Sequence, residues 1–157
     1  MKIKTWVAAC ILLGVGATGH SAVNQTQLKI NTVKSVYAAI MKNEYGDEGV
    51  MRDYGTNDMR QVLRQLEAIA DRNDGDQCNW QGGNYIIPGQ DWDLKLNQIR
   101  YSVLQNGRIR AQAKNFGKPF TVDFDVQCKD SICRVSDVFT PASLKNEWKK
   151  YARKGVC

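Results

Sequence analysis

The sequence predicts an α+β domain in which N-terminal helices cover one face of a curved, four-stranded antiparallel meander and a further helix ends the chain. Three observations support this prediction. Apolar residues recur at helical spacing before residue 73, they alternate with polar residues from residue 99 onward, and a helix-start signal follows at Thr140-Pro141. Helices that cover one face of an antiparallel sheet form an α+β domain.

The first 22 residues have the layout of a secretory signal peptide. Lys2 and Lys4 precede an apolar stretch over 6–16, and small or polar residues follow over 17–22. The apolar stretch is too short to cross a bilayer. We therefore expect residues 1–22 to be cleaved and residues 23–157 to form a single α+β domain with no membrane span. The expected location is the periplasm or the exterior of the cell.

Two helices are expected in the N-terminal half. Apolar residues at helical spacing predict the first over 27–42. The second is expected to begin with Asp58 as its N-cap, paired with Gln61 in a capping box, and to end at Asn73. The stretch 77–93 is rich in glycine and aromatic residues, so we expect an irregular loop that either packs on the core or binds a ligand or partner.

The strand registers follow from the requirement that apolar residues share one face of the sheet. A three-residue loop over 105–107, with Gly107 in the left-handed conformation, aligns odd-numbered residues of the first two strands. Four-residue loops over 116–119 and 129–132 connect the remaining strands. The expected pairs are Ala113 with Val122, Ala111 with Phe124, Arg110 with Asp125, Val126 with Val135, Phe124 with Asp137 and Cys128 with Cys133.

Four cysteines lie outside the leader, and an even number in an exported domain predicts two disulfides. The expected register sets Cys128 directly opposite Cys133, at a separation that suits a cross-strand bridge. Cys78 is then left to pair with Cys157. A zinc site made of all four thiolates is the alternative, but the spacing lacks paired C-x-x-C motifs, so we expect no metal.

The last helix is expected to begin with Thr140 as N-cap and Pro141 as the first helical residue. It contains the most basic run of the chain, 145–154, which indicates a solvated helix face rather than a polyanion site. The whole sequence has 22 Lys and Arg against 16 Asp and Glu, a formal net charge of +6. Because these charges are well mixed, we expect no nucleic-acid partner.

Two sets of residues are candidates for binding a protein partner. One set consists of aromatic side chains in the 77–93 loop, and the other of arginines on the outer face of the sheet. Exposed cross-strand ion pairs that serve only solubility are the alternative for the charged face. The candidates are Trp80, Tyr85, Trp92, Arg100, Arg108 and Arg110.

Asp137 is expected on the apolar face of the sheet, beside Phe124. A buried carboxylate must be hydrogen-bonded or neutralised. One hypothesis is a structural partner, either a backbone N–H group or the Tyr101 hydroxyl. The other is a polar group at the base of a pocket for a small apolar ligand, lined by Tyr101, Phe124, Asp137 and Phe139.

Nucleophilic catalysis has little support in the sequence. The single histidine, His20, lies in the predicted leader, so Ser–His and Cys–His pairs are absent from the expected mature domain. The chain has no P-loop and no H-E-x-x-H motif. We expect no catalytic residues and no cofactor, with an Asp137 general base as the remaining enzymatic alternative.

Three short motifs accompany this order of elements. They are Tyr54-Gly55-Thr56 leading into Met59-Arg60, Gln90-Asp91-Trp92, and Cys133-Arg134-Val135-Ser136-Asp137-Val138 followed by Ser143-Leu144-Lys145. Over residues 30–150 the chain resembles exported bacterial members of the cystatin-like, nuclear-transport-factor-like cone-fold superfamily. Cys133 stands where those members have an aromatic residue. The resemblance implies a helix-backed cone with a pocket, but no fixed activity.

The resemblance also implies a class of function. Small exported members without catalytic groups often bind other proteins, and some resemble immunity proteins that neutralise toxins delivered into the periplasm. We therefore expect a protein-binding module, most concretely an immunity or inhibitor protein whose partner is an envelope-targeting toxin or another envelope protein. A carrier of a small apolar ligand is the second hypothesis, and an enzyme with an Asp base is the third.

Overall fold

The computed structural model of this chain describes residues 18–43, 46–73, 78, 80, 84–89, 91–155 and 157. The predicted signal peptide falls outside these residues, apart from 18–22, which belong to the first helix. Within the described part of the chain, no helix is both long enough and apolar enough to cross a membrane.

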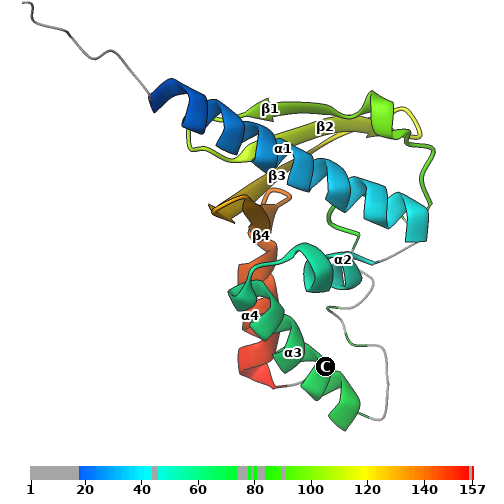
Figure 1. Cartoon of the computed structure of the whole chain (residues 1–157). Coiled ribbons are helices and arrows are strands. Elements are labelled where there is room, and N and C mark those ends of the chain that lie inside the picture. Colours follow the sequence, from blue (N-terminus) through cyan, green and yellow to red (C-terminus); the bar gives the residue numbers. More distant parts are fainter. Residues whose placement is uncertain are drawn as a thin grey trace, which may run out of the picture.

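The predicted α+β fold is confirmed. The described elements are, in chain order, α1 (Thr18–Asn43), α2 (Asp47–Tyr54), α3 (Asn57–Arg72), the 3-10 helix η1 (Leu96–Gln98), β1 (Arg100–Val103), β2 (Ile109–Asn115), β3 (Lys118–Lys129), β4 (Ile132–Phe139) and α4 (Leu144–Lys154). The strands form one antiparallel sheet in the order β1-β2-β3-β4. In Figure 1, α1 crosses one face of this sheet, and α3 and α4 lie together beyond β4.

The core lies between α1 and the sheet. Val33, Tyr37 and Ile40 of α1 are buried together with Ala111 of β2 and Phe124 of β3. The Tyr37 ring meets the Phe124 ring edge to face, with the centroids 5.9 Å apart. Burial of each such large side chain contributes roughly 1.5–3 kcal/mol, so this contact holds α1 firmly on the sheet.

The start of α3 differs from the prediction. Thr56, not Asp58, is the N-cap, and its hydroxyl accepts a hydrogen bond from the Met59 N–H group at 3.4 Å. Asp58 instead lies in the first turn, where its negative charge interacts favourably with the positive end of the helix dipole. Gly55 separates α2 from α3, and a Cβ atom at this position would lie 2.3 Å from the Met51 carbonyl oxygen. The two helices can therefore follow one another this closely only with glycine between them.

The start of α4 also differs from the prediction. Ser143 is the N-cap and accepts a hydrogen bond from the Asn146 N–H group at 3.0 Å. Thr140 and Pro141 belong to the preceding turn, in which the Thr140 N–H group donates to the Ala142 carbonyl oxygen. Because Thr140 is engaged in this turn, the helix begins three residues later than a Thr-Pro start would place it.

The β1–β2 register is confirmed, and the β2–β3 register is wrong by two residues. Tyr101 pairs with Ala111, and Gly107 has the expected positive φ of 79°. The β2–β3 connection is a two-residue turn of Phe116 and Gly117, both with positive φ, and this conformation matches the twist of a tight hairpin. A shift of two residues keeps every side chain on its predicted face. The pairs that change are Ala113 with Phe120, Ala111 with Val122 and Arg110 with Asp123.

The β3–β4 register is confirmed near its turn and broken further along. Cys128 pairs with Cys133 and Val126 with Val135, as predicted. The register then shifts between Asp125 and Val126, so that Phe124 faces Val138 instead of Asp137. This β-bulge moves Asp137 and Phe139 off the apolar face, because one extra residue reverses the alternation. The Ser136 hydroxyl donates to the Asp125 carbonyl oxygen at 3.1 Å within the bulge.

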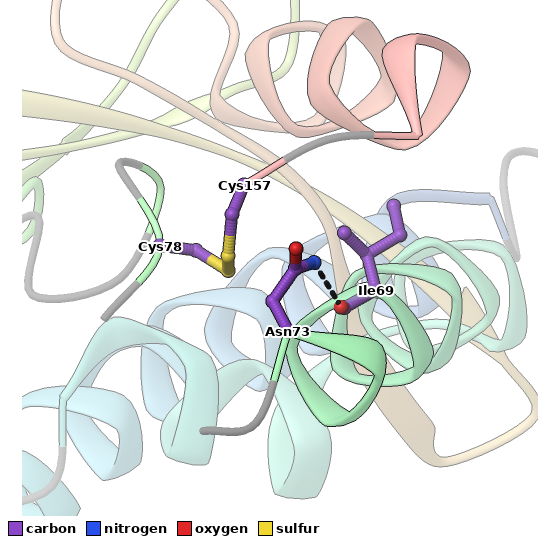
Figure 2. The surroundings of a disulfide bond; sticks show 4 residues. All are labelled: Ile69, Asn73, Cys78 and Cys157. Atoms are coloured by element: carbon purple, nitrogen blue, oxygen red, sulfur yellow. Dashed lines mark hydrogen bonds between the residues drawn. A yellow bond between two sulfur atoms is a disulfide. The ribbon is translucent and has the colours of Figure 1, made fainter. Parts of the chain in front are cut away.

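Both predicted disulfides are confirmed. Cys128 is bonded to Cys133 across the β3–β4 hairpin, and Cys78 is bonded to Cys157 over a sequence separation of 79 residues. The second bond connects the segment after α3 to the end of the chain after α4 (Figure 2). Disulfides of this kind are typical of proteins outside the reducing cytoplasm.

Candidate functional site

The four residues expected to line a cone pocket do not lie together. Phe124 has no exposed surface, and Tyr101 packs against Tyr37, with ring centroids 6.3 Å apart. The β-bulge turns Asp137 and Phe139 toward the opposite face of the sheet. In the described part of the chain these four residues therefore do not line one pocket, because packed side chains fill the apolar face and Asp137 and Phe139 lie on the other face.

Asp137 is a structural carboxylate that holds the start of α4. It accepts hydrogen bonds from the Val138 N–H group at 2.8 Å, the Lys145 N–H group at 3.0 Å and the Ser143 hydroxyl at 2.6 Å. The predicted backbone partner is thus present, whereas the Tyr101 hydroxyl is not among its partners. Among the described residues, no group of three or more His, Cys, Asp or Glu side chains could hold a metal ion.

The aromatic loop is mostly part of the core. Trp80 is only 2% exposed, so the expectation that it contacts a partner is wrong. Tyr85 and Trp92 are half-buried and pack against the core cluster. Glycine-rich loops with large aromatic residues can either cover a core or bind a partner, and here the aromatic rings mainly cover the core.

The three candidate arginines lie on the outer sheet face in different environments. Arg110 donates two hydrogen bonds to the Asp123 carboxylate, at 2.7 and 2.8 Å. The Arg108 guanidinium lies 3.5 Å from the centre of the Phe139 ring, in a cation–π contact. Arg100 is exposed and forms no ion pair or hydrogen bond through its side chain with the residues that the structure describes.

The β2–β3 turn presents the most exposed aromatic side chain of the described residues. Phe116 is 60% exposed. Its backbone is held in place, because the Phe116 N–H group donates to the Asp93 carboxylate at 2.5 Å. The ring therefore projects from a backbone whose position is fixed by the preceding loop.

The buried side chain of Asn115 provides most of this fixation. Its amide group donates to the carbonyl oxygens of Pro88 at 2.7 Å and Asp91 at 3.1 Å. Its oxygen accepts from the Asp93 N–H group at 3.1 Å. One side chain thus satisfies three backbone groups of a loop that has no regular structure, and this joins the loop to the hairpin.

A hollow of about 540 Å³ lies between this loop and the β2–β3 turn. Its walls combine prolines and phenylalanines with one acidic and one basic side chain. We call it, together with the exposed Phe116 ring, the hairpin surface. Its residues are Pro88, Gly89, Asp91, Asn115, Phe116, Lys118, Pro119 and Phe120.

Asp47 fixes the other end of the same loop. It lies at the start of α2, is buried, and accepts a hydrogen bond from the Tyr85 N–H group. Burial raises the pKa of the Asp47 carboxyl from 3.8 to about 7, although hydrogen bonds from the Tyr85 and Ile86 N–H groups act in the opposite direction. The nearby Glu48 carboxylate raises this pKa further.

Asn115, Phe116 and Asp47 were not predicted as functional residues from the sequence. The four-residue loop expected over 116–119 would have placed Phe116 in a mobile connection rather than at a fixed turn. A Phe-Gly pair between two alternating strands was the available signal, but a bulky residue at positive φ is uncommon. Asp47 gave no signal, because its role depends on a contact with a loop 38 residues away.

Comparison with known proteins extends the description of the fold only. No family model matches the sequence, and no curated protein does. A crystal structure of a protein of unknown function from Bacteroides thetaiotaomicron VPI-5482 is similar, with a TM-score of 0.52 and 15% sequence identity. The similarity covers 78% of this chain and 96% of that one. At this identity it shows a shared fold, and the cone-fold superfamily stays a prediction.

Proposed function

We propose that this protein is an exported protein-binding module that contacts its partner through the hairpin surface. The most concrete form of this proposal is an immunity or inhibitor protein that neutralises an envelope-targeting toxin. One observation carries it: Phe116, a large aromatic side chain, is 60% exposed on a turn whose backbone is fixed by hydrogen bonds. The Phe116 ring adjoins Pro119 and Phe120 at the hollow, and an exposed apolar patch of this kind suits an intermolecular contact.

The rigidity of the turn supports a binding role on energetic grounds. Association costs entropy for every side chain and loop that becomes ordered. The bonds of Asn115 to Pro88 and Asp91 order this surface before any partner arrives. Aromatic residues in or beside pockets are frequent hot spots, which contribute most of the binding free energy of an interface. Phe116 could enter a pocket of the partner while a partner side chain fills the adjacent hollow.

The surrounding surface supplies polar groups for the rim of such an interface. Lys118 and Asp91 line the hollow itself. A second hollow of about 600 Å³ shares Pro119 and Phe120 with the first and is lined by Arg100, among other residues. Rim charges of this kind mainly influence association rate and specificity. Arg100 therefore remains a candidate contact, whereas Arg108 and Arg110 already have partners within the protein.

The disulfides support the proposed location in the periplasm or outside the cell. Cys78–Cys157 and Cys128–Cys133 together include every cysteine beyond residue 10. Such use of cysteine is expected where proteins are exposed to oxidants. A toxin that acts in the envelope would share this compartment with its inhibitor.

A small-ligand carrier is a second candidate, at a place other than the one expected from the sequence. The volume of the hairpin hollow, about 540 Å³, lies within the range of known ligand sites. Its apolar walls and the polar Asn115, Asp91 and Lys118 suit an apolar molecule with one polar group. This candidate requires that a compound bind without any partner protein.

Site-specific photo-crosslinking in living cells tests the proposal. A photoreactive phenylalanine analogue at position 116 is expected to capture a protein in the envelope, and mass spectrometry would identify it as a toxin or another envelope protein. The matched control is the same analogue at Val103, which is 47% exposed at the end of β1. Equal capture at both positions, or no capture at position 116, would contradict the proposal. Release of a small molecule from the purified protein would favour the carrier instead.

A further inference from the structure

A second surface lies between α3 and α4, which are side by side in Figure 1. The later turns of both helices enclose a hollow of about 480 Å³. We call it the α3–α4 groove. Its lining residues are Gln65, Ala68, Ile69, Arg72, Lys149, Ala152 and Arg153.

The α3–α4 groove is basic, and no residue that the structure describes neutralises its charges. Three of its lining residues, Arg72, Lys149 and Arg153, are cationic, and none is acidic. None of the three forms an ion pair or side-chain hydrogen bond with any residue in the described part of the chain.

Two acidic residues on the same helices are paired elsewhere. Glu67 of α3 pairs with Arg52, and Glu147 of α4 pairs with Lys150. Asp58 and Asp71 of α3 form no ion pair in the described part of the chain, and none of these four acidic residues lines the groove. The residues that the structure describes therefore leave the positive charge of the groove open to a partner.

Compensation of the helix dipoles explains the presence of only some of these cations. Arg72 and Arg153 lie in the last turns of their helices, where a cation compensates the negative end of the dipole. Lys149 lies before the last turn of α4, where this effect has declined, so the dipole gives no reason for a cation there. The groove carries more positive charge than its helix ends require.

The end of the groove is held by covalent and hydrogen bonds. In Figure 2 the Cys78–Cys157 disulfide lies beside Asn73, whose side-chain amide donates to the Ile69 carbonyl oxygen at 2.7 Å. Ile69 is also part of the groove floor. The disulfide connects the chain after α4 to the segment after α3, and the hydrogen bond closes the last turn of α3.

We propose that the α3–α4 groove binds an acidic segment of a protein partner. Carboxylates of that segment would meet Arg72, Lys149 and Arg153, and the planar guanidinium groups suit paired contacts with carboxylate oxygens. Ala68 and Ala152 are small, so they allow close approach of a polypeptide. Lys149 and Arg153 lie about 6 Å apart along α4, and Arg72 adds a third cation from α3. Cations separated in this way suit a chain of carboxylates better than one compact anion. This inference is independent of the hairpin surface.

Nuclear magnetic resonance titration of the purified protein tests the inference. The probe is a helical peptide of repeated Glu-Leu-Glu-Ala units, and its control is the same peptide with Lys in place of Glu. The acidic peptide is expected to shift amide signals of Ala68, Ile69 and Ala152, and the basic peptide is expected to shift none of them. Inorganic phosphate and phosphatidylglycerol vesicles are titrated in parallel. Binding of phosphate or vesicles without binding of the acidic peptide would overturn the inference, as would the absence of any binding.

Two variants of equal charge separate the groove from the rest of α4. The double substitution Lys149→Ala with Arg153→Ala removes two groove cations and should weaken peptide binding by about tenfold. The matched control, Lys145→Ala with Lys154→Ala, removes two cations of the same helix that form no ion pair in the described part of the chain and do not line the groove, and it should change binding little. Equal weakening by both pairs would overturn the inference. Phe116→Ala should leave this binding unchanged, so a failed hairpin proposal would not be mistaken for a failed groove.

Discussion

Replacing Asp47 with asparagine should remove a pH dependence of stability that the native protein carries. The folded-state pKa of Asp47 is about 7 against 3.8 for an exposed aspartate, because burial disfavours the charged carboxylate. The folded protein then holds this proton more tightly than the unfolded chain does. The stabilising effect of protonation is complete below 3.8, and it is lost as the pH rises through about 7.

The magnitude follows from the size of the pKa shift. A shift of about three units corresponds to about 4 kcal/mol over the whole range, at about 1.4 kcal/mol per unit. Between about pH 5 and pH 8 the Asp47 contribution is about 3 kcal/mol. Asparagine keeps a carbonyl oxygen that can accept the Tyr85 N–H group but has no charge to desolvate.

Urea denaturation of both proteins at pH 5 and pH 8, with the disulfides kept oxidised, measures this effect. Subtracting the two free energies of unfolding at each pH cancels the other titrating groups. The stability of Asp47→Asn relative to the native protein should be higher at pH 8 than at pH 5 by about 3 kcal/mol. The same difference at both pH values, or a relative loss at pH 8, would refute the argument that Asp47 is desolvated.

Three further perturbations test separate parts of the fold. Replacing Cys78 and Cys157 with serine should lower the free energy of unfolding by ~4 kcal/mol, because the bond closes a loop of 79 residues; denaturant titration measures it. Asp137→Ala should cost ~2–3 kcal/mol, since it leaves the Lys145 N–H group and its other donors without a buried acceptor. Gly117→Ala should cost ~1 kcal/mol in a thermal melt, because Gly117 has a φ of 75°.

Each of these perturbations has a contradicting result. Serine at both Cys128 and Cys133 opens a separation of only 5 residues and should cost ~2 kcal/mol, so an equal loss for both disulfides would refute the loop argument. Asp58→Ala is the control for Asp137→Ala, and similar losses would mean that the α4 contacts matter little. An unchanged melt for Gly117→Ala would contradict the tight turn.

Alternating residues predicted the sheet faces well and the strand pairing only in part. A two-residue shift between β2 and β3 keeps Ala111 and Val122 inside, so apolar alternation could not distinguish the two registers. Between β3 and β4 the same alternation gave the register near the turn, and that register in turn predicted the Cys128–Cys133 pair. The bulge near Ser136 shifts the pairing between Asp125 and Val126, and the local alternation of apolar residues did not predict it.

Helix boundaries and the site depended on tertiary contacts that short patterns do not contain. The eight residues of α2 contain Gly49, so local propensity is weak, and burial of Val50 and Met51 stabilises the helix instead. Phe116 became a candidate only once the turn was known. Trp80 is also an aromatic residue of a loop, but it is buried. The sequence alone does not show whether such a residue packs in the core or contacts a partner.

The affinity of the captured envelope protein for defined variants tests the binding proposal most directly. Phe116→Ala should weaken the complex by about thirtyfold or more, as expected for a central aromatic contact, while leaving the free energy of unfolding unchanged. Val103→Ala removes an exposed apolar side chain elsewhere and should leave the affinity within about twofold of the native value. Equal affinities for the native protein and Phe116→Ala would contradict a binding role of the hairpin surface.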